Sequence, residues 1–85
     1  MKMSEKMDSI IRGLYEYKYD GRNYSIMEIC KKHNIPIVNS EELRGLVSSL
    51  EKDGLICRTT GSFNDHFTQL SSKGIEYVEK KFDID

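Results

Sequence analysis

The sequence has no apolar run long enough to cross a membrane, and it contains few cysteines. No stretch of about 18 apolar residues occurs in the 85-residue chain, so neither a transmembrane helix nor a membrane partner is expected. The first residues, MKMSEKMDSI, include a lysine but lack the apolar segment of a secretory signal. Two cysteines, Cys30 and Cys57, are too few for a disulfide framework. We therefore expect a cytoplasmic protein with reduced thiols.

The chain also lacks a strongly cationic segment. Its net charge is −1. Residues 1–30 carry five basic and five acidic side chains, residues 31–73 carry six and five, and residues 74–85 carry two and four. A general affinity for polyanions is therefore not indicated. The apolar share of 38% and the charged share of 32% are typical of a single globular domain.

Apolar residues at helical spacing predict two helices in the first half of the chain. The stripe of the first helix consists of Met7, Ile10, Ile11 and Leu14. Their spacing of i, i+3, i+4 and i+7 predicts a helix over about 5–18, before an Asp-Gly turn. Ser25 and Glu28 form an S-x-x-E capping box, which predicts a second, short helix over 26–33.

A third helix is predicted immediately before a glycine. Its apolar stripe consists of Leu43, Leu46, Val47 and Leu50. Asn39 or Ser40 is the expected N-cap, so the helix covers about 40–53. Gly54 then provides the left-handed residue that commonly follows a helix.

After Gly54 the pattern of apolar residues changes to that of strands. LICRTT and HFTQL are rich in β-forming residues and flank the turn cluster GSFND, which predicts a β-hairpin with strands at about 55–60 and 66–70. Ser71 is the expected cap of a last helix over 72–82. The expected fold class is α+β, mainly α, with three helices, a two-stranded hairpin and a C-terminal helix in one domain.

Two phrases in this order of elements carry a resemblance to a known group of proteins. The first phrase consists of Leu50, Lys52, Gly54, Leu55, Ile56 and Arg58, and the second of Leu70, Ser71, Lys73 and Gly74. Over roughly residues 25–80, the chain resembles winged helix-turn-helix transcriptional regulators of the MarR and PadR kind. In that fold a helix pair precedes a hairpin called the wing.

The resemblance implies that residues 40–53 form a recognition helix whose outer face enters a DNA major groove. The residues expected to contact double-stranded DNA lie on this helix, on the wing and at the start of the last helix: Ser40, Arg44, Gly45, Ser48, Ser49, Lys52, Arg58, Ser62, Asn64, His66 and Lys73. Arg44 is the candidate for a bidentate contact with guanine. Regulators of this kind are often dimers, so a homodimer through helix 5–18 or 72–82 is also expected.

Other features favour a different class of function. Glu41 and Glu42 would repel phosphate, and the wing tip GSFNDHF has no arginine. Winged helices also serve as adaptors that bind proteins, and a nearly neutral surface suits that use. Tyr15, Tyr17, Tyr19 and Tyr24 lie close together in the sequence, and aromatic residues are common at protein interfaces. A protein-binding adaptor is therefore the alternative hypothesis.

Metal and enzyme chemistry have little support. Cys30 and His33, with Cys57 and His66, are the residue types of a zinc site, but both cysteines fall at positions expected to point inward. No P-loop, G-x-S-x-G motif or paired carboxylate motif is present. We expect a binding module rather than an enzyme, with no metal, no cofactor and no small-molecule substrate.

Overall fold

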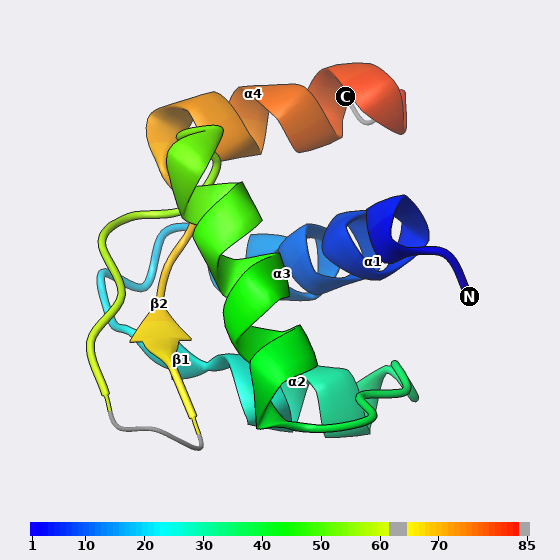
Figure 1. The fold of residues 1–85 in the computed structure, drawn as a ribbon. Helices are drawn as coiled ribbons and strands as arrows, with labels where there is room; N and C mark the ends of the chain where they lie inside the picture. Colours follow the sequence, from blue (N-terminus) through cyan, green and yellow to red (C-terminus); the bar gives the residue numbers. More distant parts are fainter. Residues whose placement is uncertain (62–64, 84–85) are drawn as a thin grey trace.

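The chain folds into a mainly helical α+β domain, as predicted. The computed structural model describes residues 1–61 and 65–83. Its elements are α1 (Met3–Tyr15), β1 (Tyr24–Ser25), α2 (Ile26–Lys32), α3 (Ser40–Lys52), β2 (Phe67–Thr68) and α4 (Ser72–Lys81). α3 crosses α1 at a steep angle, and α4 lies at the end of α3 that is farther from α2 (Figure 1).

Local capping sets where the helices begin. Ser25 accepts a hydrogen bond from the Glu28 backbone N–H at 3.1 Å, and the Asn39 side chain does the same for Glu42 at 2.9 Å. Ser71 Oγ accepts from the Gly74 N–H at 2.9 Å. Each side chain thereby pairs one backbone N–H of a first helical turn that has no partner within the helix. The predicted starts of α2, α3 and α4 are confirmed.

The strands differ from the prediction. The two-stranded sheet joins β1 to β2, with Tyr24 opposite Thr68, and not the two sides of a hairpin. The hairpin arms, residues 55–60 and 66–70, pair only through two isolated antiparallel bridges, Ile56 with Leu70 and Thr60 with Phe67. Between these bridges the first arm has three residues and the second has two, so the first arm contains a bulge. The predicted strand at 55–60 is therefore wrong as a continuous strand.

The bulge also changes which side chains of the first arm face inward. Cys57 is exposed, although strand alternation predicted that it would point into the core. On the second arm, Thr68 is fully buried and donates a hydrogen bond from its hydroxyl to the Cys57 carbonyl at 2.8 Å. An irregular arm loses the strict period of two, so the alternation rule fails at this position.

The hydrophobic core lies around α1, which packs against the three other helices. Its fully buried members include Ile10 and Ile11 of α1, Leu43 of α3 and Val78 of α4. α1 and α2 approach closely at Gly13, where a Cβ would lie only 2.5 Å from Ile29 Cγ2. Over the part of the chain that the structure describes, no helix is both long and apolar enough to span a bilayer.

Candidate nucleic-acid interface

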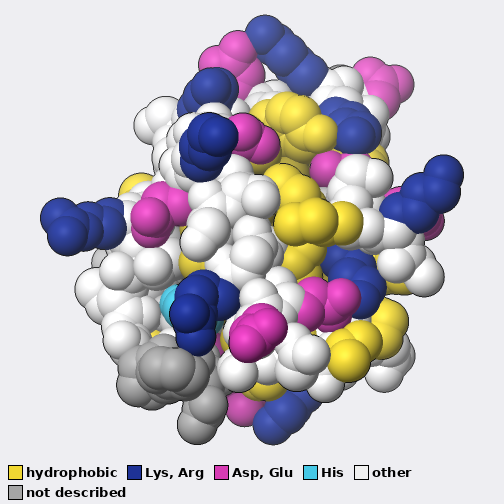
Figure 2. All heavy atoms as spheres, viewed as in Figure 1, with side chains coloured by type: hydrophobic (Ala, Val, Ile, Leu, Met, Phe, Trp, Pro, Cys, Tyr) yellow, Lys and Arg dark blue, Asp and Glu magenta, His cyan; other side chains and the backbone are white. Residues whose placement is uncertain are grey.

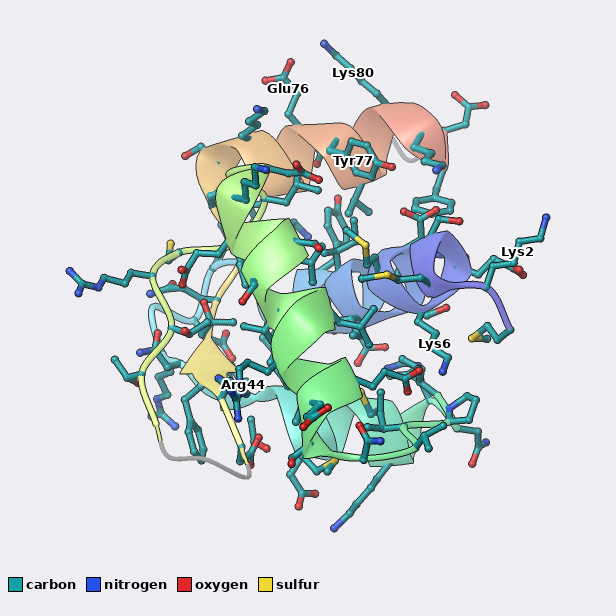
Figure 3. The ribbon with its side chains drawn as sticks, in the orientation of Figure 1. Lys2, Lys6, Arg44, Glu76, Tyr77 and Lys80 are labelled. Atoms are coloured by element: carbon teal, nitrogen blue, oxygen red, sulfur yellow. The ribbon has the colours of Figure 1, made fainter. Side chains whose placement is uncertain are left out.

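The outer face of α3 is polar because the apolar side chains of this helix are buried in the core. Leu43, Leu46, Val47 and Leu50 are 0–3% exposed. At 100° per residue, the opposite face then carries the small and charged residues. Arg44, Ser48 and Lys52 are exposed, and Ser40, Gly45 and Ser49 are half-buried. In Figure 3, Arg44 projects from α3 on the side where β2 lies.

Two of the predicted DNA-contacting lysines meet at the C-terminal end of α3. Lys52 and Lys73 line one shallow hollow together with Asp53, Leu55 and Tyr77. Lys73 extends over Gly54, since a Cβ built on that glycine would be 3.9 Å from Lys73 Nζ. The exposed Arg58 lies apart from them on the first hairpin arm. Of the four predicted cations, Lys52 and Lys73 thus lie together, whereas Arg44 and Arg58 lie at separate positions.

Glu42, predicted to repel phosphate, is engaged by a lysine that the sequence did not single out. Lys6 of α1 is only 6% exposed, and its Nζ lies 3.0 Å from both carboxylate oxygens of Glu42. The Val38 backbone N–H also donates to this carboxylate, at 3.0 Å. These contacts, the Val38 hydrogen bond first and Lys6 second, hold the pKa of Glu42 below its usual value.

Two further acidic residues, one on α3 and one on the second side of the hairpin, have partners within the chain. Glu51 Oε2 accepts hydrogen bonds from the backbone N–H and the hydroxyl of Thr59, at 2.9 and 3.2 Å, and so ties the first hairpin arm to α3. Asp65 accepts from Ser25 Oγ and from the Met27 backbone N–H at the start of α2. Both carboxylates therefore face protein donors.

Three of the residues predicted to contact DNA lie at the tip of the wing. Ser62 and Asn64 lie outside the described residues. His66 is half-buried, and its Nε2 is buried with no hydrogen-bond partner among the described residues. Burial of this ring nitrogen does not test the predicted DNA contact by His66, which stays a prediction.

The tyrosines of the predicted aromatic cluster do not form one surface. Tyr17 and Tyr24 stack with their ring centroids 4.2 Å apart. Tyr15 donates from its hydroxyl to Glu79 of α4 at 2.8 Å, and this bond raises the pKa of Tyr15. Tyr19 is 81% exposed. The four tyrosines thus form two pairs: Tyr17 and Tyr24 stack on each other, and Lys18 Nζ lies over the rings of Tyr15 and Tyr19, at 3.8 and 4.9 Å from their centroids.

The two helices proposed for a homodimer pack on each other within one chain. Lys81 of α4 lies 2.7 Å from Asp8 of α1, and the Arg12 guanidinium lies 4.4 Å from the ring centroid of Phe82. With the Tyr15–Glu79 hydrogen bond, these contacts form a polar seam along the α1–α4 boundary. The facing sides of α1 and α4 are thus already occupied.

The face that carries α3 has mixed charge. Figure 2 shows positive and negative side chains scattered over its described atoms, with neither sign forming a continuous patch. In the described part of the chain, no cluster of three or more His, Cys, Asp and Glu side chains is arranged to hold a metal. Comparison of the chain with protein-family models, curated proteins and solved structures gave no match.

Proposed function

We propose that this protein is a small winged-helix transcriptional regulator of the cytoplasm that binds double-stranded DNA through α3. The observation that carries the proposal is the outer face of α3. Cations and small residues share its outer face with the exposed Glu41, and the neighbouring carboxylates of Glu42 and Glu51 are held by protein donors. Such a face fits a helix that approaches the base edges of a major groove closely.

Each residue of this face has a distinct expected role. Arg44 is expected to make the bidentate contact with guanine, and Ser48 to contact a base or a phosphate. A Cβ built at Gly45 would point into open space, with no atom within 4 Å. The glycine therefore leaves this part of the face without a side chain. Lys52 and Lys73 at the end of α3, with Arg58 on the hairpin arm, are the expected phosphate contacts.

The pairing of carboxylates matters because the outer face of α3 carries few positive charges, and a carboxylate without a partner would repel phosphate. Glu42 forms an ion pair with Lys6 across 3.0 Å, so its charge is compensated locally. Of the carboxylates at the two ends of α3, Glu41, Glu51 and Asp53 are exposed. We therefore expect modest affinity with a strong dependence on salt, since phosphate contacts dominate such binding.

A titration of labelled duplexes with the purified chain tests the proposal. Random and genomic duplexes are compared by fluorescence anisotropy between about 50 and 200 mM salt, and each neutralised phosphate contributes a slope near −0.9 in log K against log salt. Lys52→Ala is expected to make that slope shallower by about one contact on every sequence. Arg44→Ala is expected to reduce the preference between sequences by roughly 1–3 kcal/mol.

Lys80→Ala is the matched control for these variants. Lys80 is as exposed as the α3 cations, with 76% of its side chain accessible, and it pairs with Glu76. Figure 3 shows both side chains pointing outward from α4, away from α3. Binding should therefore be unchanged in this variant. An equal loss of affinity in Lys80→Ala and Arg44→Ala would contradict binding through α3.

The mixed charge seen in Figure 2 favours a second candidate function, a winged-helix adaptor that binds protein. The same titration separates the two. A chain that shows no affinity for random or genomic duplex at about 50 mM salt, where electrostatic binding is strongest, is not a DNA-binding protein. In that case the adaptor becomes the better explanation.

A further inference from the structure

A groove runs beside α2, on a part of the molecule separate from the face used by α3. Its volume is about 540 Å³, and it is lined by Tyr17, Tyr24, Ser25, Glu28, Ile29, Lys31 and Lys32. We call it the Tyr17–Tyr24 groove. No residue of α3 or of the hairpin arms lines it. The groove and the proposed DNA contact therefore share no residue.

The aromatic wall of the groove is held in place by the protein itself. Tyr17 and Tyr24 are stacked with an interplanar angle of 17°. Lys32 Nζ donates to the Tyr17 hydroxyl at 3.1 Å and to Glu16 Oε2 at 3.0 Å. The Tyr24 hydroxyl donates to Asp20. A wall fixed in this way loses little conformational entropy when a partner covers it.

Two side chains of opposite charge at the rim of the groove have no hydrogen-bonding or ionic partner among the described residues. Among the described residues, neither the Glu28 carboxylate nor the Lys31 ammonium makes a hydrogen bond or an ion pair. Both side chains are exposed. They lie three residues apart, about 4.5 Å along the axis of α2, while Ile29 between them in sequence is only 3% exposed. The groove thus combines a tyrosine wall with one acidic and one basic side chain on α2.

We propose that the Tyr17–Tyr24 groove binds a second copy of this chain across a two-fold axis. Two α2 helices related in this way run antiparallel, so Glu28 of each copy faces Lys31 of the other. The tyrosine walls then meet near the axis. A two-fold interface must be complementary to itself, and one acidic and one basic side chain beside a tyrosine wall meet that requirement.

The expected dimer is weak. The whole chain exposes 5376 Å², and a standard stable interface covers about 800 Å² on each partner. A groove on one seven-residue helix and the loop before it contributes less than that. We therefore expect a concentration-dependent equilibrium between monomer and dimer. Because the groove excludes α3, the dimer leaves both recognition faces uncovered.

Charge reversal at the rim tests the proposal on the full chain. Sedimentation measurements from about 10 μM to about 1 mM protein give the dimerisation constant. Glu28→Lys and Lys31→Glu are each expected to weaken self-association by at least tenfold, since each change places like charges opposite each other twice. An equimolar mixture of the two variants is expected to regain dimers, because every rim contact then pairs opposite charges.

The mixing experiment distinguishes the proposal from its alternatives. Glu76→Lys on α4 is the control, since it reverses an equally exposed carboxylate outside the groove and should leave dimerisation unchanged. Circular dichroism confirms that each variant is folded. A wild-type chain that stays monomeric up to about 1 mM overturns the proposal. So does a dimer that neither single variant weakens, because such a dimer uses another surface.

Discussion

At the scale of single residues, the two cysteines differ sharply in environment. Burial raises the pKa of the Cys30 thiol to about 11, whereas Cys57 is exposed on the first hairpin arm. Because the thiolate is the reactive form, one thiol per molecule is expected to react quickly with an alkylating reagent at pH 8. Mass spectrometry of the native and denatured protein, which should carry one and two adducts, measures this.

A Cys57→Ser variant provides the control for thiol labelling. It should show almost no reaction while folded and one adduct after denaturation. Rapid labelling of this folded variant would place Cys30 in contact with solvent and contradict the packing of α2 described above.

Two glycines within helices give opposite expectations for the same substitution. A Cβ at Gly13 would lie 2.5 Å from Ile29 Cγ2 and 3.0 Å from His33 Cδ2, whereas one at Gly45 meets nothing within 4 Å. Gly13→Ala is therefore expected to lower the free energy of unfolding by about 1–3 kcal/mol through overpacking. Gly45→Ala should raise it by up to about 1 kcal/mol through helix propensity. Urea denaturation compares the two, and equal effects would contradict the close approach of α1 to α2.

At the scale of secondary-structure elements, the ion pair between Lys6 and Glu42 joins α1 to the first turn of α3. The folded state lowers the pKa of Glu42, so its ionised form stabilises the fold at pH values above the usual value of 4.5. That contribution disappears as the pH falls through the lowered pKa. The difference in unfolding free energy between wild type and Glu42→Gln should therefore be largest near neutrality and shrink below about pH 4.5.

The neighbouring Glu41 offers a control for this pH dependence. It is exposed in the same helical turn, and Glu41→Gln removes a carboxylate there while the Lys6–Glu42 ion pair stays in place, so it should lower the free energy of unfolding less than Glu42→Gln at neutral pH. Denaturation with urea at several pH values measures all three proteins. A constant difference between wild type and Glu42→Gln down to pH 3 would show that the carboxylate charge does not support α3.

The helices were predictable from sequence because their signals are local. The apolar stripe of α3 and the Asn39 cap lie within the helix or next to it, so the predicted and observed ranges differ by one residue at the C-terminal end. β1 has two residues and forms only because it pairs with Phe67–Thr68, a segment distant from it in the sequence. A two-residue strand carries no period-two pattern, and nothing local to it marks the pairing. The bulge in the first hairpin arm escaped prediction for the same reason.

The outer face of the candidate site was also largely predictable, since a buried stripe fixes which positions of α3 face outward. Arg44, Ser48 and Lys52 are exposed as expected. The burial of Lys6 was not predicted, because lysine is rarely buried without a partner and its partner lies 36 residues away. Charge compensation between distant elements appears only once the helices are packed together.

At the scale of the whole molecule, α1 packs against all three other helices, and from this we expect the domain to behave as one cooperative unit. A single core of this size is expected to unfold in one step. α4 belongs to that core through Val78, which is 0% exposed. Loss of packing in α4 should therefore increase the fraction of molecules in which α2 is unfolded, although the two helices are joined mainly through α1.

Val78→Ala tests this coupling in the Cys57→Ser background, where Cys30 alone reports on unfolding. The substitution leaves a cavity and is expected to lower the free energy of unfolding by about 2 kcal/mol. When labelling is slower than refolding, the labelling rate of Cys30 follows the unfolding equilibrium and should rise about 30-fold. Lys80→Ala, on the exposed side of α4, should change the rate by about twofold or less. If circular dichroism shows the full destabilisation while Cys30 labelling stays at the wild-type rate, then α4 opens separately from the core around α1.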